Sequence, residues 1–234
     1  MITQDHLCLQ RAKQFIMHKK DKTKPYIIFD IGANKGAYAN LIYSMINAKH
    51  IVYSFEPNLK AFQMLKQNCP QTDNYKVFNI GFSSSIRDSI LYDPGNKGSE
   101  IASLYNREVF KDFKIEDQPT EIPIKLSTVD NFLHENNIDQ VHYMKIDVEG
   151  HELEVLLGAN DSFNKKLINA GQFEFGSTFA DSNITIEDCV AFFTKHNYSL
   201  FFNDVLPSNI VKKTSDIQSV DNWENILFIN NEFL

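Results

Sequence analysis

A glycine-containing turn follows a short apolar run near the start of the chain. The run YIIF at 26–29 leads into DIGANKG at 30–36. A short continuous apolar run is typical of a strand buried on both faces, and open α/β sheets bind ligands at the carboxyl ends of their strands. Gly32 allows a tight turn and a close approach to a ligand, and Gly36 allows the next helix to pack closely. Ordinary strand-to-helix turns look similar, so the turn alone does not establish a ligand site.

An acidic residue ends the next predicted strand. Glu56 stands just before Pro57 and 26 positions after Asp30. A carboxylate at this place can accept hydrogen bonds from both hydroxyls of a ribose, and the spacing is near the roughly 20 residues of nucleotide-binding folds. Glu56 could alternatively interact with the start of the following helix. Together with the turn, it favours a cofactor that contains a nucleoside.

The residue two positions after Gly32 distinguishes between such cofactors. Dinucleotide-binding turns carry a second glycine there, which makes room for a pyrophosphate. This chain has Asn34 instead. An amide beside the acidic Asp30 suits a cofactor with an amino acid and a positive sulfonium, so the sequence favours S-adenosylmethionine over NAD. The alternatives are a nucleotide-dependent oxidoreductase and a non-catalytic module that binds a cofactor or a protein.

Acidic residues and one histidine gather at the end of the predicted strand 141–146, in the segment KIDVEGHELE at 145–154. We expect Asp147, His151 and, at the end of the next strand, Glu174 to face a reaction cleft. Each could accept the proton that an alcohol loses as it is methylated. These three residues and Glu149 could instead bind a divalent metal. Their spacing is not diagnostic of a metal site, so we expect no metal.

Helical and strand patterns alternate along the chain, which predicts a parallel sheet with right-handed crossovers. The predicted helices cover 5–19, 36–47, 57–68, 128–135, 152–158 and 185–197. The predicted strands cover 26–29, 51–55, 76–80, 141–146, 172–175, 198–202 and 226–229. The last two strands are expected to form an antiparallel pair at one edge. Residues 81–126 are less regular, which indicates loops and short strands that cover the ligand.

The composition is that of a soluble globular protein with one substantial core, since 43% of the 234 residues are hydrophobic. A formal net charge of -7 disfavours a nucleic-acid partner, because binding to phosphates needs concentrated Lys and Arg. No run approaches the roughly 18 apolar residues of a membrane span, and the first twenty residues lack the apolar stretch of a signal peptide. We therefore expect a cytoplasmic protein. Its three cysteines, Cys8, Cys69 and Cys189, are expected to be buried and unpaired.

Three segments resemble the FkbM family of S-adenosylmethionine-dependent methyltransferases. They are DIGANKG at 30–36, SFEP at 54–57 and KIDVEGHELEVLLGA at 145–159. The resemblance extends from about Ile27 to Glu174. It implies an α/β, class I methyltransferase fold, which is a Rossmann-like three-layer sandwich with a mostly parallel seven-stranded sheet. A leading helix and linker would cover 1–24, and a single methyltransferase domain 25–234.

The resemblance also implies the site. The methionine part of the cofactor would lie near the turn at 30–36, the ribose at Glu56, and the adenine beside 79–81. The residues expected to bind the cofactor are Asp30, Gly32, Asn34, Gly36, Glu56, Pro57, Asn79, Ile80, Gly81 and Asp147. The acceptor would be a hydroxyl of a small molecule or carbohydrate, such as a sugar, glycan or natural product. Its pocket is expected from 81–126 and from the region near Phe179, Asp181 and Trp223.

Overall fold

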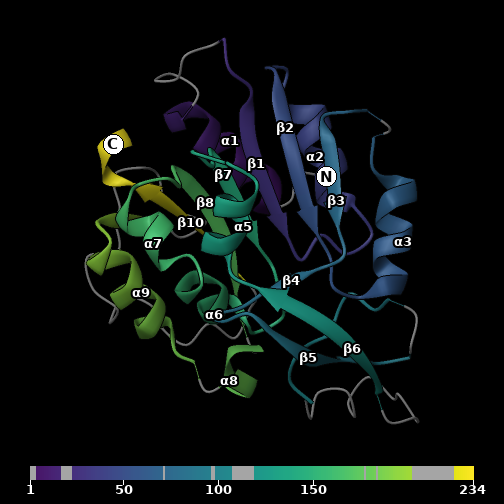
Figure 1. The fold of residues 1–234 in the computed structure, drawn as a ribbon. Coiled ribbons are helices and arrows are strands. Elements are labelled where there is room, and N and C mark those ends of the chain that lie inside the picture. The colour runs from purple at the N-terminus through teal and green to yellow at the C-terminus, as the bar shows by residue number, and fades with distance from the viewer. Residues whose placement is uncertain are drawn as a thin grey trace.

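Seven strands form the main sheet of the protein, which we describe from a computed structural model (Figure 1). The structure describes residues 4–16, 23–70, 72–95, 98–106, 119–176, 178–182, 184–201 and 224–234. The sheet has the strand order β3-β2-β1-β7-β8-β10-β9. The strands are β1 (Tyr26–Ile31), β2 (His50–Phe55), β3 (Tyr75–Phe78), β7 (Tyr143–Ile146), β8 (Ala170–Phe175), β9 (Tyr198–Phe201) and β10 (Glu224–Asn230).

The strand directions confirm the predicted sheet. Strands β3, β2, β1, β7 and β8 are parallel to one another, whereas β10 runs antiparallel to both of its neighbours, β8 and β9. The sheet is therefore mostly parallel with an antiparallel edge, as expected of a class I methyltransferase fold. The predicted pairing of the last two strands is confirmed, although β10 inserts between β8 and β9.

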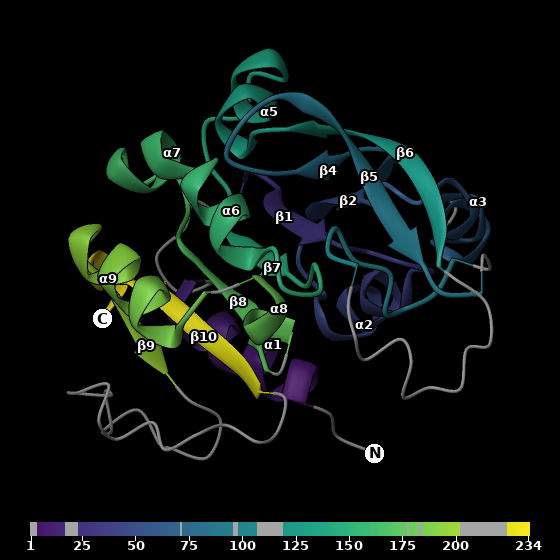
Figure 2. The same ribbon diagram turned by 90° about the horizontal axis from the view of Figure 1, so that it is seen from below.

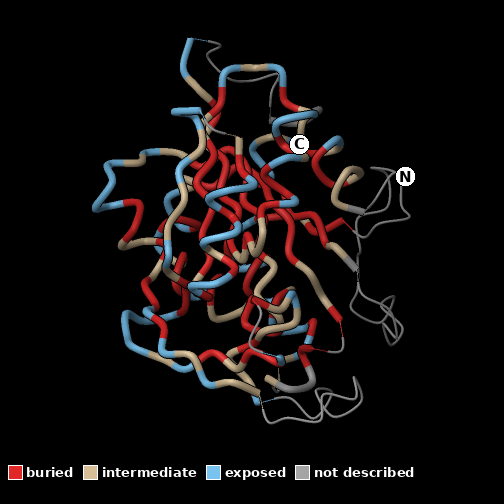
Figure 3. Tube along the Cα trace, turned by 90° about the vertical axis from the view of Figure 1, so that its right-hand side faces the viewer, coloured by how far each residue is buried: buried red, intermediate tan, exposed pale blue. Residues whose placement is uncertain are grey.

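Helices cover both faces of this sheet and make the outer layers of the sandwich (Figure 2). They are α1 (Gln4–Ile16), α2 (Ala37–Met45), α3 (Leu59–Asn68), α5 (Val129–Glu135), α6 (Glu152–Leu157), α7 (Asn160–Asn164), α8 (Thr178–Ser182) and α9 (Ile186–Lys195), with a short 3-10 helix at Asn231–Phe233. One face packs Leu9 of α1 and Ile42 of α2 against Tyr143. The opposite face packs α5, α6, α7 and α9 in the larger cluster, which contains Phe29 and Phe173. The buried residues accordingly gather in the middle of the molecule (Figure 3).

Side-chain caps explain where several helices begin. The Asn58 side chain accepts hydrogen bonds from the backbone N–H of Lys60 and Ala61, so α3 begins at Leu59 and not at Pro57 as predicted. Thr128 caps α5 in the same way. At the start of α9, Thr185 and Asp188 form a reciprocal capping box.

A second, three-stranded sheet lies at the carboxyl edge of the main sheet (Figure 1). Its strands are β4 (Gly81–Phe82), β5 (Arg87–Asp93) and β6 (Thr120–Ser127), in the order β4-β6-β5. The prediction of loops and short strands here was therefore only partly right, because β5 and β6 pair antiparallel along seven residues of β5. On β6, Ile124 and Leu126 are buried while Lys125 between them is exposed. This alternation of period two is the strand signal that the sequence contained.

Three further observations concern membrane spans, the cysteines and the first helix. None of the described helices is long and apolar enough to cross a membrane. All three cysteines are buried, as expected, and are thiols outside any disulfide. Helix α1 packs against β8 and β10 of the main sheet, and residues 17–19 of its predicted range lie outside the described residues.

Candidate functional site

A cavity of about 370 Å³ opens at the carboxyl edge of the main sheet, beneath the small sheet. Its walls come from α1, the turn after β1, the end of β2, the small sheet, the segment 98–106 and the ends of β7 and β8. The lining residues are Asp5, Ile31–Lys35, Ala37, Tyr38, Phe55–Pro57, Ile80–Phe82, Leu91, Ser99, Glu100, Ala102, Leu104, Ile124, Leu126, Lys145, Asp147–Glu149, His151 and Glu174.

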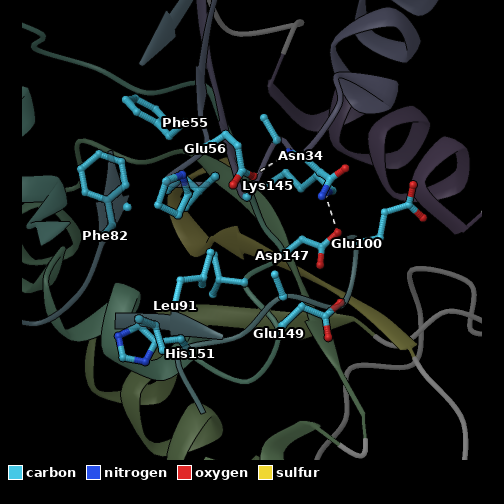
Figure 4. A pocket seen from close by; sticks show the side chains of 18 of the residues that line it. Asn34, Phe55, Glu56, Phe82, Leu91, Glu100, Lys145, Asp147, Glu149 and His151 are labelled. Atoms are coloured by element: carbon cyan, nitrogen blue, oxygen red, sulfur yellow. Dashed lines mark hydrogen bonds and ion pairs between the residues drawn. The ribbon is translucent and has the colours of Figure 1, made fainter. Parts of the chain in front are cut away.

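The walls divide by chemistry. Apolar side chains, among them Phe82 and Leu91, lie on one side, and acidic side chains lie on the other (Figure 4). The acidic lining residues are Asp5, Glu56, Glu100, Asp147, Glu149 and Glu174, whereas the described walls contain two lysines, Lys35 and Lys145. Such a cavity suits a ligand that combines a flat apolar part with a positively charged part.

Glu56 is held rigidly at the end of β2. Its Oε1 accepts a hydrogen bond from the backbone N–H of Asn58 at 2.7 Å, and its Oε2 accepts one from the backbone N–H of Asn34 at 2.9 Å. The residue is only 6% exposed. Burial raises the pKa of Glu56 to about 7, although the two backbone hydrogen bonds act in the opposite direction. Glu56 therefore lines the cavity and also binds the backbone of Asn58, the residue that caps α3, while its contact with a ribose stays a prediction.

The turn after β1 needs its glycines for packing. Gly32 and Gly36 have φ values of 80° and 92°, in the left-handed region. A Cβ atom on Gly32 would lie 1.7 Å from the backbone oxygen of Asp147, so the glycine permits close contact between the ends of β1 and β7. A Cβ atom on Gly36 would lie 3.1 Å from Cδ1 of Leu65 in α3. Gly32 lines the cavity and Gly36 does not.

Asn34 connects the turn to the segment that covers the cavity. Its backbone N–H donates to Glu56, and its side-chain amide donates to the carbonyl oxygen of Ser99 at 3.2 Å. It also has a positive φ of 44°, which asparagine tolerates better than most residues. Asn34, which stands where dinucleotide-binding turns have a second glycine, therefore connects the turn after β1 with the end of β2 and with the segment 98–106.

Asp147 lies at the end of β7, beside a buried lysine. The ammonium of Lys145 donates to Oδ2 of Asp147 at 2.7 Å and also lies 5.1 Å from the centre of the Tyr38 ring. One carboxylate oxygen each from Asp147, Glu149 and Glu174 lies within 4.8 Å of the other two. The structure thus brings together the carboxylates that the sequence singled out, in an arrangement that could bind a metal ion.

Two neighbouring glutamates bind protons unusually tightly. Burial, with the Asp147 and Glu149 carboxylates nearby, raises the pKa of Glu174 to about 9. Burial likewise raises the pKa of Glu152, the first residue of α6, to about 8. Both side chains are therefore mainly neutral at pH 7, which reduces the repulsion within the acidic cluster.

His151 lines the cavity but has both ring nitrogens occupied. Its Nδ1 lies 3.0 Å from the hydroxyl of Tyr105, and its Nε2 lies 3.0 Å from the hydroxyl of Ser83. Burial lowers the pKa of His151 to about 4, so the ring is neutral at pH 7. A neutral imidazole donates through one nitrogen and accepts through the other. His151 therefore bridges the segment 98–106 and the connection between β4 and β5.

Most of the residues that line the cavity lie in a part of the chain that matches a known protein family. Residues 30–200 match the family model described as the methyltransferase FkbM domain, which is well over half of the chain. The chain belongs to the FkbM methyltransferase family. The resemblance found in the sequence is thus confirmed, and the matched range includes both the turn after β1 and the acidic cluster.

Three proteins illustrate how this FkbM chain relates to others. The hexuronic acid methyltransferase AglP of Haloferax volcanii is 29% identical over 137 residues, which cover 58% of this chain and 51% of AglP. This chain thus spans about half the length of that curated relative. The FkbM methyltransferase structure from Methylobacillus flagellatus KT has a TM-score of 0.53 at 16% identity, over 88% of this chain and 43% of the other. The N-terminal domain of human METTL16 in complex with SAH has a TM-score of 0.50 at 13% identity, over 96% and 70%. Both structural similarities support the class I methyltransferase fold.

Three residues expected to bind the cofactor of an FkbM protein do not line the cavity: Asp30, Gly36 and Asn79. Asp30 is fully buried in β1, where burial raises its pKa to about 6. The side-chain amide of Asn79 donates to the backbone oxygens of Glu56 and Pro57, both at 2.9 Å. Asn79 and Gly36 therefore support the wall from behind. The other expected residues do line the cavity.

The structure also adds residues that the sequence did not single out. Lys145 belongs to the matched motif but had no expected role, and Asp5 comes from α1, outside the matched range. Among the residues expected near the acceptor, Phe179 is buried against Phe175, with ring centroids 4.5 Å apart. The side chain of Asp181 and the whole of Trp223 lie outside the described residues.

Proposed function

We propose that this chain is an enzyme that transfers a methyl group from S-adenosylmethionine to a hydroxyl group of a sugar, glycan or natural product. The observation that carries the proposal is the Glu56 carboxylate, held at the end of β2 inside the cavity of an FkbM-family chain. Two relatives support it. AglP is named as a hexuronic acid methyltransferase, and the human METTL16 domain was solved with SAH, the demethylated form of the donor.

The chemistry of the walls fits this cofactor. Glu56 can accept from the ribose hydroxyls, and the apolar side chains around Ile80, Gly81 and Phe82 suit the flat adenine. The acidic end of the cavity suits the positive charges of the methionine part. S-adenosylmethionine would supply a methyl group that is already activated by its positively charged sulfur.

The protein would mainly align the acceptor and remove its proton. Alignment alone can contribute several kcal/mol to the lowering of the barrier. We assign the proton to the Asp147 carboxylate, which Lys145 holds in place at 2.7 Å. Glu174 is protonated at neutral pH because its pKa is raised to about 9, so it would donate a hydrogen bond to the acceptor. Removal of the acceptor proton by a carboxylate such as Asp147 contributes a factor of about 10²–10⁴ to the rate.

His151 takes a different part from the one the sequence suggested. Because both of its nitrogens are bound to hydroxyl groups, it has no free lone pair for an acceptor proton in this arrangement. We assign it a positioning role, in which it fixes Tyr105 and Ser83 and thereby the wall of the cavity. Asp147 thus keeps the role of proton acceptor suggested by the sequence, whereas Glu174 changes from a candidate proton acceptor to a hydrogen-bond donor.

The first experiment is isothermal titration calorimetry with S-adenosylmethionine and S-adenosylhomocysteine. We expect the wild-type protein to bind both ligands, and Glu56→Ala to weaken both at least about tenfold, since the ribose contact is common to them. Glu187→Ala, on the exposed side of α9, is the matched control and should bind as the wild type does. No binding of either ligand to the wild-type protein would overturn the proposal. If the protein binds these ligands, the next experiment is a screen for methyl transfer to neutral sugars and uronic acids.

A further inference from the structure

Helix α1 contributes a carboxylate to the cavity from outside the part of the chain that matches the family. Asp5 lies in the first turn of α1 and lines the cavity, whereas the family match begins at residue 30. The helix is firmly packed, because Cys8, Leu9 and Ala12 are buried against the main sheet. The position of Asp5 is therefore set by the fold and not by a loose terminal segment.

Two side-chain amides orient this carboxylate. The amide of Gln172 on β8 donates to Oδ1 of Asp5 at 2.6 Å, and that of Asn225 on β10 donates to the same oxygen at 3.2 Å. The orientation of Gln172 is itself determined, since its Oε1 accepts from the hydroxyls of Tyr143 at 2.6 Å and Tyr38 at 3.3 Å. Its NH₂ group must therefore face Asp5. The other oxygen, Oδ2, has no hydrogen bond or ion pair with any residue in the described part of the chain.

The surroundings of Asp5 carry an excess of negative charge. Lys145 is a cation near Asp5, but it is already bound to Asp147 and lies over the Tyr38 ring. Burial lowers the pKa of Lys145, but Asp147, Asp30 and Asp5 together raise it further than burial lowers it. One ammonium is thus surrounded by three carboxyl groups, and a second positive group would be bound favourably here.

The order of the strands indicates which ligand group reaches Asp5. Glu56 lies at the end of β2, and the cavity continues past β1 to β7 and β8, where Asp5 lies. A donor whose ribose is held by Glu56 would extend its amino-acid part in this direction. We propose that Asp5 binds the positively charged α-ammonium group of the methyl donor, so that α1 is part of the cofactor site. This inference rests on the proposed function.

The test compares two ligands on one isosteric variant. Asp5→Asn removes the charge but keeps an oxygen that can accept from Gln172. The probes are S-adenosylhomocysteine and 5′-methylthioadenosine, which share the adenosine and a neutral thioether sulfur, while only the first has the amino-acid part. We expect Asp5→Asn to weaken S-adenosylhomocysteine binding at least about tenfold and to leave 5′-methylthioadenosine binding unchanged. Asp73→Asn, at an exposed position between α3 and β3, should change neither affinity.

The outcomes separate this inference from the proposed function. Equal weakening of both ligands would show a merely structural role for Asp5, and no weakening would show no role; either result overturns the inference while donor binding by the wild-type protein stands. If the wild-type protein binds neither ligand, the proposed function fails and takes the inference with it. Should Asp5→Asn fail to fold, Asp5→Glu keeps the charge, and the proposal requires it to retain the preference for S-adenosylhomocysteine over 5′-methylthioadenosine.

Discussion

The carboxyl groups of the cavity share one chemistry but differ in what surrounds them. Glu56 is buried and bound to two backbone N–H groups, and its pKa is about 7. Glu174 is half-buried near other carboxylates, and its pKa is about 9. Asp147 has an ammonium at 2.7 Å. Environments that separate the pKa values of neighbouring acids also separate their roles in proton transfer.

Substitution of the two proposed catalytic acids should therefore have unequal effects. Asp147→Asn is expected to lower kcat about 10²–10⁴-fold, because the proton acceptor is lost. Glu174→Gln should lower kcat less than about tenfold at pH 7, since an amide can donate the same hydrogen bond as a protonated carboxyl group. The measurement is steady-state kinetics with each variant, after thermal unfolding has shown that both are folded. Equal losses in both variants would contradict these roles.

The pH profile gives an independent check on Glu174. With a pKa of about 9, its carboxyl group is protonated below that pH and ionised above it. We expect the wild-type rate to fall as the pH rises through 9, because the acceptor loses its hydrogen-bond donor. Glu174→Gln keeps a donor at every pH and should lack this fall. A fall of the same size in both enzymes would assign it to another group.

The acidic cluster also leads to a prediction about metals. Asp147, Glu149 and Glu174 could coordinate an ion, but Lys145 already neutralises Asp147 and a proton neutralises Glu174 at pH 7. We therefore expect methyl transfer to be unchanged after treatment with EDTA. The control is enzyme treated with EDTA and then given excess Mg²⁺ or Mn²⁺. Loss of activity with EDTA and its recovery with either metal would show that the cluster is a metal site.

Single residues could be predicted from the sequence where a strand end placed them. Glu56 and Asp147 follow directly after buried strands, and the ends of parallel strands meet at one edge. Asp5 could not be predicted in this way, because its approach to the cavity depends on how α1 packs against β8 and β10. The role of His151 depends equally on Tyr105 and Ser83, which lie 46 and 68 positions away from it along the chain.

At the scale of elements, the close contact of β1 and β7 depends on Gly32. Gly32→Ala would place Cβ 1.7 Å from the Asp147 backbone oxygen and would also strain a backbone with φ of 80°. Gly95→Ala is the matched control, because its φ is 81° and nothing lies within 4 Å of the added Cβ. We expect the control to lose about 1–2 kcal/mol of stability from backbone strain, and Gly32→Ala to lose several kcal/mol more or not to fold. Urea unfolding measures both, and equal losses would contradict the steric argument.

The segment 98–106 should depend on the imidazole of His151. His151→Ala removes the hydrogen bonds to Tyr105 and Ser83, each worth roughly 0.5–1.5 kcal/mol. Hydrogen–deuterium exchange in 98–106 is therefore expected to speed up about tenfold or more. His134→Ala, on the exposed side of α5, should leave this exchange unchanged. Unchanged exchange in His151→Ala would show that other contacts hold the segment.

The fold could be predicted best where helices and strands alternate. The positions of β1, β2 and β7 could be predicted from their apolar runs, because a strand buried on both faces has a continuous apolar pattern. The small sheet was harder to predict, since β5 and β6 each expose one face and are far apart in the sequence. The insertion of β10 between β8 and β9 reverses the chain order, and no local pattern records such an order.

At the scale of the whole molecule, buried acids make stability depend on pH. Burial raises the pKa of Asp30, Glu56, Glu152 and Glu174 above the ordinary value in each case. The folded protein therefore retains protons that the unfolded chain loses as the pH rises above about 4.5. Stability falls with rising pH wherever the folded state binds more protons than the unfolded state. The carboxyl groups should thus favour the folded state most on the acidic side of neutrality.

Glu152 provides the sharpest test of this dependence. It is 1% exposed, its Oε1 accepts from the backbone N–H of Val148, and its pKa is about 8. Glu152→Gln keeps an acceptor for Val148 and cannot ionise. In urea unfolding, the stability of the wild type relative to this variant should fall by roughly 1.4 kcal/mol per pH unit between pH 4.5 and 8, and should level off above pH 8. Glu135→Gln, whose side chain is exposed on α5, should show no such trend. A constant difference between the wild type and Glu152→Gln from pH 5 to 9 would mean that Glu152 is already ionised in the folded protein at pH 5.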